Sequence, residues 1–210
     1  MRNVAVFLLM TGCGAPLADD SADLAAEHAA LVCDVPATPD GGVAVKLQRG
    51  RASQWCWIAV ASMVSDVIGQ PLSQCELASQ MFGKQCCTET GSAIPDCNHP
   101  GRSIDVLVDV LGLTATMEKR QLDEVELASE LSAGSPVGMH LNDPKGNGHT
   151  TLITNMVQLE GTAYYTVNDP ALGSIALTYE QLKTGYNVQG DWTWSYTLHH
   201  ISRDGKACGL

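Results

Sequence analysis

Basic residues are scarce in this chain of 210 residues, which has 12 Lys and Arg against 23 Asp and Glu and a formal net charge of −11. A surface this acidic disfavours a nucleic-acid partner, because phosphate binding relies on clustered Lys and Arg. The chain also lacks an apolar run of about 20 residues, which excludes a transmembrane helix in the mature protein. It has no internal repeat, and its length and 45% hydrophobic content suit one globular domain with its own core.

Two further absences narrow the chemistry. A zinc site built on C-C-x9-C-x-H, which ends at His99, is the weaker interpretation of the cysteines because the chain has no two C-x2-C pairs. The D-C-S-G pattern typical of peptidoglycan-cleaving thiol hydrolases is missing as well. His199 and His200 suggest a pair of metal ligands, but neighbouring residues on a strand face opposite ways and do not easily share an ion. We therefore expect no metal site and no cofactor.

The N-terminal segment is typical of a secretory signal. Residues 1–12 combine one positive charge, the apolar stretch V-A-V-F-L-L-M and small residues. They resemble a bacterial lipoprotein signal, with Met10-Thr11-Gly12 before Cys13, in which case Cys13 carries the lipid and is the only link to a membrane. The alternative is ordinary cleavage near A-P-L-A and secretion. Both place the domain outside the cytoplasm. Residues 13–42 are expected to be a tether or pro-segment, and residues 43–210 the folded domain.

The cysteines fit an oxidising compartment. If Cys13 is set aside for lipid and Cys56 for chemistry, six remain, and an extracytoplasmic chain uses such cysteines for disulfides. We expect Cys86 and Cys87 to pair with Cys75 and Cys97, in either order. The two outermost of the six, Cys33 and Cys208, are expected to pair with each other. This arrangement leaves Cys56 unpaired. The six disulfide candidates are Cys33, Cys75, Cys86, Cys87, Cys97 and Cys208.

The secondary-structure pattern changes from helices to strands along the chain. Ser53 is the expected N-cap of a helix that ends at Gly69, which places Cys56 in its first turn. Further helices are predicted within residues 74–82, 102–112 and 122–131. Short β-branched runs then predict strands within residues 136–141, 150–159, 163–167, 174–178 and 192–201. The fold class is therefore α+β, with the helical part packed on a C-terminal antiparallel sheet.

A cysteine at the start of a helix is suited to nucleophilic chemistry, because the free N–H groups and positive dipole end favour the thiolate. Such a nucleophile needs a base, and His149 opens a strand after a Gly-rich turn. A hairpin would bring the end of the following strand beside His149. That strand ends in Asn168 and Asp169, either of which can fix the orientation of the imidazole.

Three motifs, Q-W-C-W-I-A, G-H-T-T-L-I and V-N-D-P-A-L-G, resemble those of papain-like cysteine peptidases over residues 48–173. The similarity is to compact bacterial members, namely secreted effectors of plant pathogens and peptidase domains of bacteriocin exporters. It implies Cys56 as nucleophile, His149 as general base and later acid, and Asp169 as orienting residue, with Asn168 as the alternative. The resemblance also implies a glutamine in the oxyanion hole, Gln48 or alternatively Gln54.

The chain departs from papain in two respects. Papain has Asn in the third role, and its histidine lies roughly 130–150 residues beyond the cysteine. Here the separation between Cys56 and His149 is 93 residues, as in the compact members.

The sequence therefore predicts a secreted or lipid-anchored thiol peptidase that acts on peptides or proteins and works as a monomer. Two alternatives stay open. Transglutaminases also place Cys-Trp at a helix start with His and Asp on strands, so acyl transfer to an amine is possible. The other alternative is a disulfide-rich binding module in which Cys56 is buried and inert.

Overall fold

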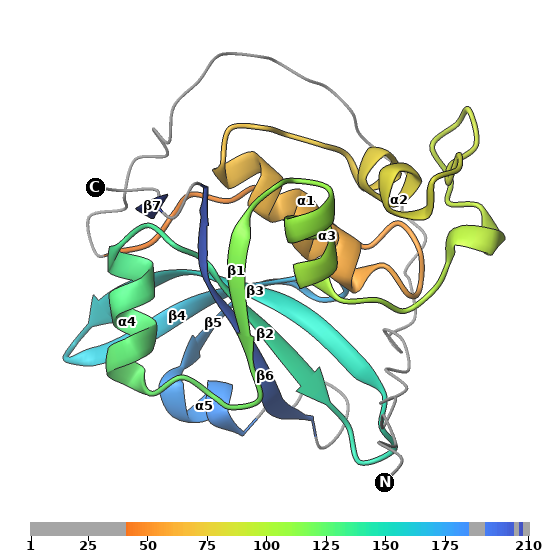
Figure 1. Cartoon of the computed structure of the whole chain (residues 1–210). Helices are drawn as coiled ribbons and strands as arrows, with labels where there is room; N and C mark the ends of the chain where they lie inside the picture. Colours follow the sequence, from red (N-terminus) through yellow and green to blue (C-terminus); the bar gives the residue numbers. More distant parts are fainter. Residues whose placement is uncertain (1–40, 185–191, 204–205, 208–210) are drawn as a thin grey trace, which may run out of the picture.

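A computed structural model describes residues 41–184, 192–203 and 206–207. The described chain begins with helices and continues as a curved sheet (Figure 1). The helices are α1 (Cys56–Val67), α2 (Gln74–Phe82), the 3-10 helix η1 (Pro95–Cys97), α3 (Ser103–Asp109), α4 (Glu124–Ser132) and α5 (Tyr179–Lys183). The strands are β1 (Thr114–Glu118), β2 (Val137–Asn142), β3 (Gly148–Leu159), β4 (Thr162–Asp169), β5 (Gly173–Thr178), β6 (Thr193–Arg203) and β7 (Lys206–Ala207).

The sheet is antiparallel throughout, in the order β1-β6-β2-β3-β4-β5, and β7 pairs with β6. The α+β prediction is confirmed, as are the three later helices and five strands expected from the sequence. Four elements were not predicted: η1, β1, α5 and β7. Strand β1 lies between α3 and α4 in the chain but pairs with β6, and that long-range pairing stabilises an otherwise weak strand sequence.

Helix α1 runs through the core, and of its residues only Asp66 is not buried. Its 3.6-residue apolar spacing was expected, but the expected cap was wrong. The N-cap residue is Trp55, which makes no side-chain capping bond, whereas the hydroxyl of Ser53 accepts a hydrogen bond from Asn98 Nδ2 at 2.9 Å. The chain turns away after α1 at Gly69, whose φ of 67° suits glycine.

The sheet separates two apolar clusters, with α1, α2 and α3 on one face and α4 and α5 on the other (Figure 1). Consecutive residues of β3 show the separation, because Leu152 packs into the first cluster and Ile153 into the second. Side chains alternate across a strand, so a strand covered on both faces is apolar at successive positions.

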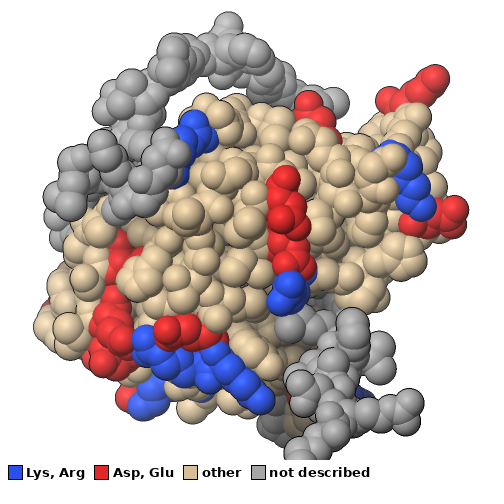
Figure 2. All heavy atoms as spheres, in the orientation of Figure 1, with Lys and Arg blue, Asp and Glu red and all other residues tan. Residues whose placement is uncertain are grey.

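No helix of the described residues is long and apolar enough to cross a membrane. Acidic and basic side chains lie next to one another on the face shown in Figure 2, and no extended basic patch is visible there. The predicted signal, tether, lipidated Cys13 and Cys33–Cys208 pair involve residues outside the described part of the chain, and they stay predictions.

Candidate active site

His149 and Asp169 meet at the edge of the sheet where β3 begins and β4 ends. The imidazole Nε2 of His149 lies 2.9 Å from Oδ1 of Asp169. Both residues are buried, and Asp169 has no exposed surface. The β3–β4 hairpin explains this contact, because Leu152 faces Asn168 in the register and the two strands therefore bring residues 149 and 169 to the same end. The predicted pairing is present.

The turn that follows β4 fixes the Asp169 carboxylate. Its Oδ1 also accepts hydrogen bonds from the backbone N–H groups of Ala171, at 2.7 Å, and Leu172, at 3.1 Å. A carboxylate that accepts several N–H bonds is held in one orientation and is favoured as an anion. Asp169 is thus a preorganised acceptor for the imidazole.

The segment before α1 connects the nucleophile helix to this turn. The N–H of Gly50 donates to the carbonyl of Pro170 at 3.1 Å, and the Arg49 guanidinium donates to the carbonyl of Ala171 at 2.6 Å. A Cβ built on Gly50 would lie 4.0 Å from Pro170 Cβ and 4.0 Å from the backbone carbon of Trp55. Gly50 therefore lies near both Pro170, the residue after Asp169, and Trp55, the residue before Cys56.

The cysteine-rich loop, residues 83–102 between α2 and α3, holds the start of α1 from the other side. The indole N–H groups of Trp55 and Trp57 donate to the carbonyls of Cys97 and His99, at 2.8 and 3.0 Å. The backbone N–H of Gln54 donates to the side chain of Asn98 at 2.9 Å. Both tryptophans are thus structural anchors that position the first turn of α1, where Cys56 lies.

Two disulfides close this loop, Cys75–Cys87 and Cys86–Cys97. The prediction that Cys86 and Cys87 pair with the flanking cysteines is confirmed. Cys86 and Cys97 have no exposed surface. A buried disulfide is shielded from reductants, because exchange needs a thiolate to reach the sulfur.

Cys56 differs from its expected state. It is disulfide-bonded, although the sequence predicted a free thiol. The prediction that Cys56 is left unpaired is therefore wrong for this form of the chain.

The sequence left two choices open, Asp169 or Asn168 as the orienting residue and Gln48 or Gln54 in the oxyanion hole. Asn168 donates from Nδ2 to the carbonyl of Val45 at 3.3 Å, which ties the strand to the N-terminal segment, whereas Asp169 carries the contact with His149. Burial raises the pKa of Asp66, near the end of α1, and the nearby Gln48 side chain opposes this shift. Ten residues of helix separate Asp66 from Cys56, roughly 15 Å. Gln48 therefore lies near the other end of α1, and its place in the oxyanion hole stays a prediction.

Gln54 lies two residues before Cys56, and its Oε1 is buried without a hydrogen-bond partner. Its amide is thus close in the chain to the nucleophile, in the turn held by Asn98. The structure favours Gln54 over Gln48 as the side chain near the start of α1.

Two residues near His149 were not predicted as part of the site. The ring of Trp192 lies edge-on to the His149 ring, with centroids 6.2 Å apart, and Trp192 also packs against the second apolar cluster. His140 on β2 donates to or accepts from Thr150 at 3.0 Å, and burial together with the nearby His149 lowers its pKa to about 4. Its cross-strand position beside Thr150 follows from the register, which the sequence did not reveal.

A family model described as papain-like cysteine protease AvrRpt2 matches residues 39–183 of this chain. The comparison with curated proteins found no match.

Three solved structures are similar to the chain at low identity. The peptidase domain of Streptococcus ComA, a bi-functional ABC transporter involved in a quorum sensing pathway, is 16% identical with a TM-score of 0.48, covering 76% of this chain and 98% of that chain. A double glycine motif protease from an AMS/PCAT transporter, in complex with the leader peptide, is 13% identical with a TM-score of 0.47, covering 78% and 95%. A mite allergen structure, from a study of Blo t 1 and Der p 1, is 12% identical with a TM-score of 0.44, covering 76% and 67%.

The family match spans more than half of the chain and includes the Cys56, His149 and Asp169 positions. The chain therefore belongs to the papain-like cysteine protease family of AvrRpt2 and is a cysteine-type peptidase.

Proposed function

We propose that the peptidase cleaves peptide bonds through an acyl-enzyme on Cys56, with His149 as general base and acid and Asp169 as its orienting residue. The observation that carries the proposal is the buried contact between His149 Nε2 and Asp169 Oδ1, which leaves the other ring nitrogen, Nδ1, for the nucleophile. Gly50 donates its N–H to the carbonyl of Pro170 and lies near Trp55, the residue before Cys56, which supports the same grouping.

The reaction proceeds in two steps. The Cys56 thiolate attacks the carbonyl carbon of the scissile bond, and the tetrahedral intermediate collapses to a thioester as protonated His149 gives its proton to the leaving amine. Water then attacks the thioester while His149 accepts its proton. The carboxylic acid product leaves, and Cys56 and His149 return to their starting states. Asp169 stabilises the imidazolium form and keeps the ring in one orientation.

Backbone N–H groups at the start of α1 and the amide of Gln54 are the proposed donors to the developing oxyanion. The first N–H groups of a helix have no intrahelical acceptor, and Trp55 provides no side-chain cap for α1. No acidic residue occupies the first turn, so no side-chain carboxylate competes there for the positive end of the helix.

Catalysis by this route requires reduced Cys56, because the thiolate is the nucleophile. The disulfide at Cys56 therefore represents an inactive state, and mild reduction should activate the protein. Cys86 and Cys97 have no exposed surface, so we expect their disulfide to resist mild reduction.

The decisive experiment separates peptide hydrolysis from acyl transfer. Mildly reduced protein is incubated with casein and a labelled primary amine, and new N-termini and incorporated label are measured by mass spectrometry. New termini without label support the peptidase proposal. Label without new termini would assign transglutaminase-like chemistry. The absence of both products would support an inert binding module. Cys56→Ala is the matched control.

We further propose that the enzyme works outside the cytoplasm, either lipid-anchored at Cys13 or secreted. The signal-like residues 1–12 and the two disulfides of the cysteine-rich loop support this location. Mass spectrometry of the mature protein tests it, because a chain that begins at lipid-modified Cys13 supports the anchored form. Retention of Met1 in the protein isolated from its source would contradict both forms. We expect a monomer, which light scattering checks.

A further inference from the structure

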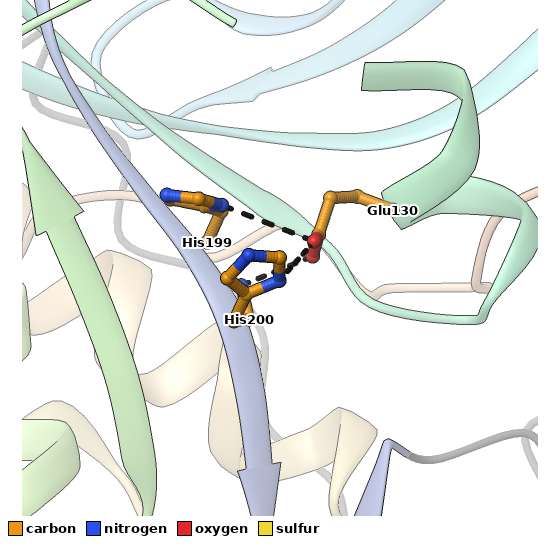
Figure 3. Close-up of side chains that lie close together, drawn as sticks. All are labelled: Glu130, His199 and His200. Carbon is orange, nitrogen blue, oxygen red and sulfur yellow. Dashed lines mark hydrogen bonds and ion pairs between the residues drawn. The ribbon is translucent and has the colours of Figure 1, made fainter. Parts of the chain in front are cut away.

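We propose that Glu130, His199 and His200 form a binding site for a zinc-type divalent metal ion, separate from the catalytic residues. Glu130 lies on α4, and the two histidines are consecutive on β6 (Figure 3). One ligand atom from each residue lies within 4.8 Å of the others. Two imidazoles and one carboxylate are a ligand set that zinc uses with a remaining position for water.

The site lies away from the candidate active site along the sheet. Leu198, next to His199, pairs with Gly138 near the start of β2, whereas His149 pairs with Leu141 near its end. Strand β2 lies between β6, which holds His199, and β3, which holds His149. The positions of β2 beside the two histidines are about four residues apart, roughly 13 Å at 3.3 Å per residue. Each group has its own set of side chains.

A β-bulge explains how adjacent histidines share one side of the strand. Thr116 of β1 pairs with His199 and Thr114 pairs with Ser202, so two residues of β6 oppose one residue of β1. His200 has a φ of 51°, in the left-handed region that residues with a side chain seldom adopt. The two rings consequently lie with centroids 4.1 Å apart. The sequence argument against a shared ion assumed a regular strand and is wrong here.

The Glu130 carboxylate joins the two histidines. Its Oε1 forms an ion pair with Nδ1 of His200 and lies 3.9 Å from Nδ1 of His199, as Figure 3 shows. Its Oε2 accepts the backbone N–H of His200 at 3.0 Å, which supports the unusual conformation of that residue. An ion about 2 Å from each donor holds tetrahedral donors about 3.3 Å apart, so small side-chain rotations bring these three atoms to ligand positions.

Burial and entry also suit an ion. The side chains of His199 and Glu130 are 4% and 10% exposed, whereas that of His200 is 64% exposed. Two ligands are thus held within the protein, and the third faces solvent, from which an ion can enter. Metal ligands bind in their deprotonated forms, so the ion would take the place of the direct contact between His200 and Glu130.

The far side of His199 has a second carboxylate. Its Nε2 is buried without a hydrogen-bond partner and lies 3.7 Å from Oε2 of Glu118. Histidines that bind a metal commonly direct the other ring nitrogen to a carboxylate, which fixes the tautomer. With Nδ1 on the ion, Nε2 carries the proton and faces Glu118. A bound ion therefore accounts for an otherwise unpaired polar atom.

Zinc titration of the full chain tests the proposal by isothermal calorimetry, without reductant and after iodoacetamide treatment so that thiols do not bind the metal. We expect one zinc per chain. Glu130→Gln and His200→Gly should each weaken binding at least 10-fold, and Glu118→Gln should weaken it by about 10- to 100-fold. His99→Ala changes an exposed histidine outside the cluster and should leave zinc affinity unchanged.

His200→Gly keeps the test valid if other variants fold poorly. Glycine suits a φ of 51° and lacks the imidazole, so this variant should fold at least as well as the parent without metal yet lose binding. Cobalt substitution gives a second measurement, because visible d–d bands report histidine ligation and should disappear in His200→Gly. Zinc affinity or cobalt spectra equal in the parent and His200→Gly would overturn the proposal, as would the absence of stoichiometric binding by the parent.

Discussion

The Nε2 atom of His149 contacts the buried carboxylate of Asp169 at 2.9 Å, and two backbone N–H groups fix the same carboxylate oxygen. This arrangement assigns the two ring nitrogens different tasks. Nε2 is held by Asp169, so proton transfer with a nucleophile uses Nδ1. The contact also distinguishes Asp169 from Asn168, whose side chain bonds to the carbonyl of Val45.

Replacement of Asp169 should impair catalysis far more than replacement of Asn168. Asp169→Ala removes the acceptor that orients His149, and we expect kcat/KM to fall by about 10²- to 10⁴-fold, the usual range for a general acid–base contribution. Asp169→Asn keeps a hydrogen-bond acceptor without the charge, so its kcat/KM should lie between the values of Asp169→Ala and the parent. Steady-state kinetics with a fluorogenic peptide measures the effect.

Asn168→Ala is the matched control. Loss of its hydrogen bond should lower the free energy of unfolding by about 1 kcal/mol with little change in kcat. The assignment of the orienting role to Asp169 would be contradicted by a larger loss of kcat in Asn168→Ala than in Asp169→Ala.

The two glutamines should differ in the same way. Gln54→Ala removes an amide next to the start of α1, and we expect kcat to decrease about 10²- to 10³-fold with little change in KM, as for other oxyanion donors. Gln48→Ala should leave kcat nearly unchanged, because the Gln48 side chain acts on the pKa of Asp66, about ten residues along α1 from Cys56. Equal effects in both variants would remove Gln54 from the oxyanion hole.

The two disulfides of the loop should contribute similar stability but different positioning. Each closes a short loop, so replacing either pair by serine should cost about 3 kcal/mol of unfolding free energy in the chain-entropy model. The Cys86–Cys97 replacement should also reduce kcat/KM, because the carbonyl of Cys97 holds the Trp55 indole beside Cys56.

The Cys75–Cys87 pair is the control for this comparison. Chemical denaturation and kinetics on both double variants separate stability from positioning. If activity per folded molecule falls equally in both, the loop acts through stability alone.

Acid should destabilise the fold through His140. Its pKa is lowered from 6.5 to about 4 by burial and by His149, and the ring also faces Tyr196 and a small pocket that includes Arg102. The folded state favours the neutral ring, so this contribution is complete above pH 6.5 and is lost as the pH falls towards 4. The loss amounts to roughly 3 kcal/mol.

Denaturant titrations between pH 7 and 4 measure this dependence. His140→Gln does not titrate in this range, so its stability should fall less steeply than that of the parent. Parallel stability curves for the two proteins would contradict a neutral buried His140.

The sequence predicted the parts of the fold and site that depend on local pattern. Apolar spacing located α1, and a strand pair ending in N-D-P predicted that a hairpin would bring His149 and Asp169 together. The pairing of Cys86 and Cys87 with flanking cysteines followed from their proximity in the chain. The residues in each case lie close together in the chain, so their spacing limits the structures that they can form.

The errors concern long-range or irregular geometry. Strand β1 exists because it pairs with β6, which lies about 80 residues later in the chain, so its own sequence carries little signal. The bulge at His200 reverses the side-chain alternation that a regular strand would have. The disulfide state of Cys56 was likewise not predicted, because parity counts cysteines without regard to their positions in the fold.

The rate of Cys56 alkylation, measured with and without His149, tests the central claim most directly. After mild reduction, low concentrations of iodoacetamide at pH 6–7 should modify one equivalent of thiol, localised to Cys56 by mass spectrometry, with parallel loss of peptidase activity. This pH lies below the range in which an ordinary thiol ionises, about 8.5. His149→Ala should slow the reaction at least 10-fold and abolish turnover without unfolding the domain. Equal alkylation rates in the two proteins, or peptidase activity that survives in Cys56→Ala or His149→Ala, would contradict the account.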